Sequence, residues 1–131
     1  MRRALLTLLL SSCLGCVRGQ LVKDEAGKSF LIKARVPVTL AVDFGRAGKP
    51  AFQEDVSVTD GSTPKDVVSV FFPVKSGAVC CDTREVSEIG GVSIDPAAGG
   101  WWMVEVNGSH NVSPFRTRVK RGDVIRWVYS K

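Results

Sequence analysis

Nothing in this sequence supplies the set of groups that enzymes use as nucleophile, base and orienting partner. Its single histidine, His110, could be matched only with Cys81, and no third residue at a suitable spacing would orient the base. The glycine-rich loop that holds phosphates is also missing, because residues 60–64 are too short for one and contain no lysine. We therefore expect a protein that is not an enzyme and that uses no cofactor.

Cysteine is scarce. Outside the N-terminal segment the sequence contains two cysteines, Cys80 and Cys81. Adjacent residues of an extended chain point in opposite directions, and one distant histidine does not complete a thiolate site, so we expect no metal. Outside the cytoplasm these thiols would bond to each other or to another chain. A bond between them closes a strained ring, which we interpret as a static brace, with a reducible redox element as the alternative.

The chain has no apolar run long enough to span a bilayer. A charged start and the short apolar core at residues 4–10 are typical of a signal peptide, which we assign to residues 1–19. The residues before Cys13 resemble a bacterial lipobox, those before Cys16 are a poorer match, and residues 17–19 have the form of an ordinary cleavage site. We favour lipidation at Cys13 or Cys16, which predicts an extracytoplasmic, lipid-anchored protein of the cell envelope. Ordinary secretion is the alternative.

The net charge of the whole chain says little about its binding partners. Without residues 1–19, 112 residues remain, enough for one domain, and the net charge falls from +5 to +2. The last sixteen residues, however, carry six basic side chains against Asp123, a net charge of +5. We interpret this excess as a solvated face that protects a strand edge, with an anion site that includes Arg116 and Arg118 as the alternative. Nucleic acid is not an expected partner of an exported protein.

Regular structure is expected to begin after residues 20–33, which show little periodicity and are predicted to be a tether with at most a short strand at residues 30–32. Residues 35–44 alternate between apolar and polar, which predicts a half-buried strand. Pro37 cannot donate a ladder hydrogen bond, so the strand should lie at an edge or begin its pairing there. Turn residues follow, and the alternation resumes at residues 52–58, which predicts a hairpin.

A helix is predicted to begin at Pro64. Thr63 offers a hydroxyl cap and Asp66 a carboxylate at the third helical position. Pro73 should end the helix near Phe71, because the residue before a proline avoids the helical region. Helical spacing places three apolar residues on its inner face: Val67, Val70 and Phe71.

The remaining residues read as strands. A strand is expected over residues 85–94, interrupted at Gly90-Gly91, and two aromatic strands close the chain at residues 101–106 and 124–129. Asn107-Gly108 tolerates positive φ at both central positions of a tight turn. Alternation puts Trp102 in the core and leaves Trp101 and Met103 more exposed, where they could contact a planar ligand or a sugar.

The order strand, strand, helix, strands predicts an α+β fold of the β-grasp (ubiquitin-like) type, a mixed sheet with one helix packed on one face. Four motifs, at residues 60–63, 89–92, 100–108 and 122–129, resemble the bacterial exported domain DUF4430. That family is related to the C-terminal domain of transcobalamin and intrinsic factor. The resemblance covers residues 34–131 and implies a β-grasp domain there. The helical domain that supplies half of the cobalamin cavity in those carriers has no counterpart in this chain.

These patterns together predict a monomeric, exported, non-catalytic binding or interaction module for an unknown small molecule or envelope protein. Its expected contact area combines Trp101 and Met103 with the Cys80-Cys81 ring, and Arg116 and Arg118 are the candidate anion contacts. The alternatives are a thiol-disulfide redox protein that uses the cysteine pair, a corrinoid-binding accessory domain and a structural envelope component. Fold does not by itself fix which of these applies.

Overall fold

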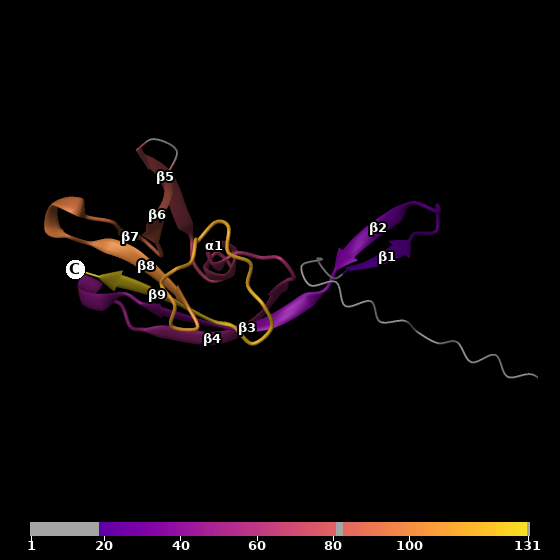
Figure 1. Cartoon of the computed structure of the whole chain (residues 1–131), viewed down its shortest axis with the longest axis horizontal. Coiled ribbons are helices and arrows are strands. Elements are labelled where there is room, and N and C mark those ends of the chain that lie inside the picture. The colour runs from indigo at the N-terminus through magenta and orange to yellow at the C-terminus, as the bar shows by residue number, and fades with distance from the viewer. Residues whose placement is uncertain (1–18, 81–82, 131) are drawn as a thin grey trace, which may run out of the picture.

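The computed structural model describes residues 19–80 and 83–130. The fold is α+β, as predicted, and consists of strands with one short helix (Figure 1). The elements are β1 (Gly19–Lys23), β2 (Ser29–Lys33), β3 (Arg35–Asp43), β4 (Phe52–Thr59), α1 (Pro64–Val68), β5 (Val74–Cys80), β6 (Thr83–Ile89), β7 (Val92–Ser93), β8 (Trp101–Val106) and β9 (Val124–Ser130). Short 3-10 turns lie at Gly45–Ala47 and Pro96–Ala98. The predicted signal peptide and both lipidation candidates, Cys13 and Cys16, fall outside the described residues.

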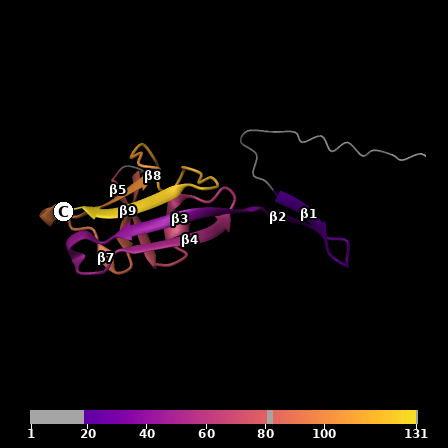
Figure 2. The ribbon, with the colours of Figure 1, turned by 90° about the horizontal axis from the view of Figure 1, so that it is seen from below.

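The main sheet has the strand order β4-β3-β9-β8. Its two central strands, β3 and β9, are parallel, and each outer strand is antiparallel to its neighbour. A second sheet, β5-β6-β7, lies with α1 on one side of the main sheet (Figure 1). We call the main-sheet face toward α1 the inner face and the opposite face the outer face. Seen from below, the outer face carries no other element of the described chain (Figure 2).

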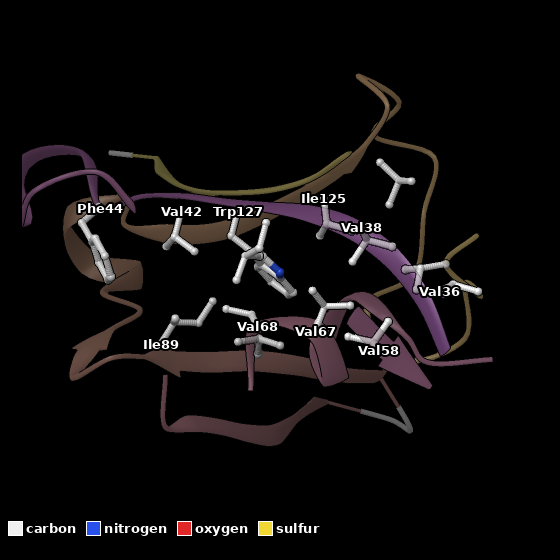
Figure 3. Packing of buried hydrophobic residues seen from close by; sticks show 14 residues of the cluster. Val36, Val38, Val42, Phe44, Val58, Val67, Val68, Ile89, Ile125 and Trp127 are labelled. Atoms are coloured by element: carbon white, nitrogen blue, oxygen red, sulfur yellow. The ribbon is translucent and has the colours of Figure 1, made fainter. Parts of the chain in front are cut away.

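The hydrophobic core fills the space between the inner face and the layer formed by α1 and β6. Val67, Val68 and Ile89 point from that layer toward Val42 and Trp127 of the main sheet (Figure 3). These five side chains are at most 1% exposed. Burial of such apolar side chains is the main favourable term that holds the two layers together.

Strand β3 matches its prediction closely, with the inward alternation intact along its length. Pro37 was expected at an edge or where pairing begins, and the second alternative is confirmed, since β3 is a central strand whose pairing with β9 begins two residues later. The Pro37 carbonyl accepts a hydrogen bond from Gly122 N at 2.8 Å, so this side of the residue faces β9, yet pairing with β9 begins only at Thr39. The missing N–H of the proline therefore costs no ladder hydrogen bond.

Helix α1 begins at Pro64 as predicted. The Thr63 hydroxyl accepts from Asp66 N at 3.3 Å, while the Asp66 carboxylate accepts from Thr63 N at 2.9 Å, which forms a reciprocal capping box. These two bonds satisfy amides that the first helical turn leaves without partners.

The predicted end of this helix is wrong, because α1 stops at Val68 rather than near Phe71. The amides of Val70 and Phe71 bond three residues back, to the carbonyls of Val67 and Val68, so the chain tightens into turns at this point. Consequently Val70 and Phe71 are 56% and 40% exposed, and the predicted inner face is corrected to three buried residues: Pro64, Val67 and Val68.

The segment expected to be a tether contains an antiparallel hairpin instead, β1 with β2, which extends away from the two sheets (Figures 1 and 2). Its register places Leu21 opposite Leu31 on one face, while Val22 and Ile32 belong to the other face. All four side chains are exposed. The short strand allowed at residues 30–32 is confirmed within β2, whereas β1 was not predicted, because its exposed apolar residues Leu21 and Val22 form no alternating pattern.

Strand β5 was not predicted, but the interruption at Gly90-Gly91 is confirmed as the turn between β6 and β7. The Asn107-Gly108 turn is confirmed too, with φ of 51° and 79°. No helix within residues 19–80 and 83–130 has the length and apolar character needed to cross a bilayer.

Candidate functional site

A hollow of about 420 Å³ opens between β6 of the second sheet and β8 of the main sheet. We call it the tryptophan hollow because all three tryptophans of the chain line it. Its lining residues are Glu85, Val86, Trp101, Trp102, Val104, Pro114 and Trp127. The volume falls in the range that small-molecule sites occupy, and a mostly apolar wall with few polar groups is typical of such sites.

Trp102 is held firmly in this wall. Its indole Nε1 donates to the carbonyl of Val92 at 2.8 Å. Its ring meets Phe44 edge-on, with centroids 5.7 Å apart, and lies tilted against Tyr129 at 5.2 Å. These contacts fix the side chain before any ligand arrives, so a bound molecule would not have to order it. The predicted burial of Trp102 is confirmed in part, since the residue is half-buried and packs against the core.

Trp127 lies beneath the hollow and belongs to the core (Figure 3). It is 1% exposed, and its indole Nε1 has no hydrogen-bond partner. Within the described residues this nitrogen is the one fully buried side-chain nitrogen or oxygen left without a partner. Buried polar groups are normally hydrogen-bonded. The position of the Trp127 ring is therefore set by its apolar packing and not by a hydrogen bond of its N–H group.

Among the described residues that line the hollow, Glu85 is the one with an ionisable side chain. The residue is half-buried, and its carboxylate has no hydrogen bond or ion pair with another described residue. Glu88, further along β6, differs: it accepts from Ser93 Oγ at 2.7 Å and pairs with Lys75 Nζ at 3.0 Å. The Ser93 hydrogen bond, followed by that of Lys75, lowers the pKa of Glu88 below its ordinary value of 4.5. Glu85 is thus the carboxylate of this strand that remains available.

Met103 lies on the outer face and does not line the hollow. It is 43% exposed and Trp101 36%, so the prediction that these two are the exposed pair of β8 is confirmed. Next to them, Glu105 lies 3.7 Å from Arg126 and 3.4 Å from His110. Trp101 and Met103 share one side of β8, and of the two Trp101 alone lines the hollow.

The two candidate anion contacts also lie outside the hollow. Arg118 Nη1 donates to the carbonyl of Gly61, in the turn before α1, and Arg116 is exposed in the same loop. Pro114 in this loop accepts from Lys65 N at 3.0 Å, which holds the loop against the start of α1. Neither arginine lines the hollow with Trp101.

Of the cysteine pair, Cys80 lies within the described residues and Cys81 does not. Cys80 ends β5, paired with Thr83 of β6, and Cys81 lies outside the described residues, so the Cys80-Cys81 ring stays a prediction. Among residues 19–80 and 83–130, no three His, Cys, Asp or Glu side chains form a group that could hold a metal ion.

Of the seven lining residues, sequence reasoning proposed only Trp101 as a ligand contact, and Glu85, Pro114 and Trp127 are among those that it missed. Glu85 looked like an ordinary solvated carboxylate, since its position opposite β8 depends on how the two sheets pack. Pro114 lies in a long irregular loop, where periodicity carries no information. Trp127 could have been identified from the sequence, because it is the third tryptophan and lies in the second of the two predicted aromatic strands.

The chain matches no protein-family model and no curated protein sequence. Its fold is similar to the crystal structure of a protein from Ruminococcus gnavus ATCC 29149 that is named as a candidate metal-binding protein. The two share 19% sequence identity with a TM-score of 0.54, and the match covers 73% of this chain and 97% of the other. At this identity the similarity concerns the fold alone.

Proposed function

We propose that this chain is an exported, lipid-anchored and non-catalytic binding module that holds a small ligand in the tryptophan hollow. The observation that carries the proposal is the convergence of Trp101, Trp102 and Trp127 on one hollow, although they come from two strands. Tryptophan offers a large, rigid contact surface at little cost in side-chain entropy, which is why it dominates many binding sites.

The proposed architecture is a β-grasp domain of the DUF4430 type. The strand order β4-β3-β9-β8, with its parallel central pair and a helix after the first hairpin, supports this assignment. In such a layout one helix packs on the inner face of the sheet, and the chain then continues from α1 to β8. Here that connection forms the second sheet, and β6 supplies one wall of the hollow.

Export and anchoring are proposed from the N-terminal sequence. A charged start, a short apolar core and the lipobox-like residues before Cys13 or Cys16 support a lipid anchor as the only membrane attachment. Release from bacterial membranes by detergent but not by salt is expected, and Cys→Ala changes at both positions should free the protein. Soluble behaviour of the unchanged chain would contradict the anchor and leave the binding proposal untouched.

Binding is tested by titration of the intrinsic tryptophan fluorescence with a library of small molecules. A ligand in the hollow should quench or shift the emission, and Trp101→Leu should weaken its affinity. Met103→Leu, on the outer face, is the matched control and should leave the affinity unchanged. If no ligand that perturbs the fluorescence loses affinity in Trp101→Leu, the hollow is not the binding site.

The two alternatives have separate tests. A corrinoid macrocycle would extend beyond a hollow of about 420 Å³, so we expect no saturable quenching by cobalamin at micromolar concentration. The redox alternative depends on Cys80 and Cys81. Reversible reduction of this pair near the glutathione potential would favour it over a static ring.

A further inference from the structure

We infer that the tryptophan hollow binds an organic cation, an ammonium group that carries small alkyl substituents. This inference rests on the proposed function, since it names the class of ligand for the same site. It follows from three properties of the wall: its aromatic side chains, its apolar side chains and its single charge.

The aromatic side chains come first. The face of an indole ring carries negative electrostatic potential, so tryptophan is the side chain that attracts a cation most strongly through its π system. The attraction grows when the cation is removed from water, as it is in a hollow. Trp101 and Trp102 are the two tryptophans of this wall that are not fully buried.

The apolar side chains suit the substituents rather than the charge. Val86, Val104 and Pro114 complete the wall, one from each of β6, β8 and the long loop. A bare ammonium would lose its hydration against such groups without compensation. A trimethylammonium group spreads its charge over methyl groups, which pack against valine and proline as alkanes do.

Among the described lining residues, the wall carries charge of one sign. Glu85 is acidic and lacks a partner among the described residues, and none of the seven lining residues is a lysine or arginine. Arg116 and Arg118, the candidate anion contacts, lie outside the lining. The negative charge of Glu85 would attract a cationic ligand in this partly desolvated hollow and would repel an anionic one.

A neutral sugar is the strongest competing ligand, because it also stacks on tryptophan and donates to a carboxylate. It would not benefit from the negative charge of Glu85. The comparison that decides between them is therefore a pair of molecules of the same shape that differ in charge.

The experiment uses choline and its uncharged isostere 3,3-dimethylbutan-1-ol, titrated into the full chain with detection by tryptophan fluorescence and calorimetry. Choline should bind with an affinity roughly ten-fold or more above that of the isostere. Glu85→Gln keeps the shape of the wall and removes its charge, and it should lower choline affinity by about two- to five-fold while leaving the isostere unchanged. Glu54→Gln, on exposed β4 outside the hollow, is the matched control and should bind choline as the unchanged chain does.

Each of the other outcomes contradicts one part of the proposal. Equal binding of the two isosteres, or a sugar that binds more tightly than choline and is unaffected by Glu85→Gln, would reject the organic cation and retain the hollow as a binding site. Absence of binding by either isostere and by every member of the library would reject both the cation and the proposed function. Thermal unfolding of the Glu85→Gln chain separates a loss of affinity from a loss of folding.

Discussion

The indole Nε1 of Trp102 donates a 2.8 Å hydrogen bond to the carbonyl of Val92, and this bond joins the main sheet to the end of the second sheet. Tyr129 makes the neighbouring connection, because its hydroxyl donates to the carbonyl of Ser93 at 3.0 Å. The two side chains are in ring contact with each other. They hold β7 against β8 and β9, and so they define one end of the gap in which the tryptophan hollow lies.

Trp102→Phe should destabilise the domain by about 1–3 kcal/mol, since it leaves the Val92 carbonyl without its donor. The measurement is chemical unfolding followed by circular dichroism. Trp101→Phe is the matched control on the same strand, where no such hydrogen bond is lost, and its effect should stay within about 0.5 kcal/mol. Equal effects of the two changes would show that the Trp102 bond contributes nothing.

Gly100→Ala should be destabilising by about 1–3 kcal/mol. A Cβ at this position would overlap Tyr129 Oη and lie 2.8 Å from Cζ, so the ring would have to leave its place beside Trp102. Gly77→Ala is the control, because a Cβ there meets nothing within 4 Å. If both alanine variants unfold at the same denaturant concentration, the close approach of Gly100 to Tyr129 is not what fixes this corner.

Thr63→Ala should cost about 1–2 kcal/mol of stability through loss of the cap on α1. Thr63→Ser retains the hydroxyl and should restore most of that loss. The readout is again the midpoint of chemical unfolding. A serine variant as unstable as the alanine variant would assign the effect to the lost methyl group rather than to the hydrogen bond with Asp66.

Glu88 should titrate below its ordinary pKa of 4.5 in the folded chain, because Ser93 and Lys75 stabilise its charged form. A lowered folded pKa means that the associated stability is fully present above pH 4.5 and is lost as the pH falls through the lowered value. Ser93→Ala should raise this pKa toward the ordinary value, as measured by carboxyl NMR. An unchanged pKa in that variant would show that the hydrogen bond from Ser93 does not cause the shift.

Leu40→Ala should cost about 2–5 kcal/mol, because this side chain is completely buried in the middle of β3. Leu31→Ala, in the hairpin, removes the same atoms from a side chain that is 61% exposed and should change stability by less than about 0.5 kcal/mol. A large loss in Leu31→Ala would mean that the hairpin packs against the domain in solution.

Local rules were sufficient for β3, for the start of α1 and for the Asn107-Gly108 turn, because each depends on neighbours within a few residues. The end of α1 was not predictable from Pro73 alone, since the chain tightens before the proline acts. The tryptophan hollow could not be predicted from the sequence for a different reason. It requires Glu85 of β6 to face Trp102 of β8 across two separate sheets, and no periodicity encodes that packing.

The β1-β2 hairpin has a thermodynamic consequence of its own. An isolated pair of strands is only marginally stable in water, and the exposure of Leu21, Leu31 and Ile32 shows that the rest of the protein adds little to it. Amide exchange in residues 19–33 should therefore be governed by local opening, whereas exchange in β3 and β9 should require global unfolding. The midpoint of global unfolding therefore reports the stability of the two packed sheets and not that of the β1-β2 hairpin.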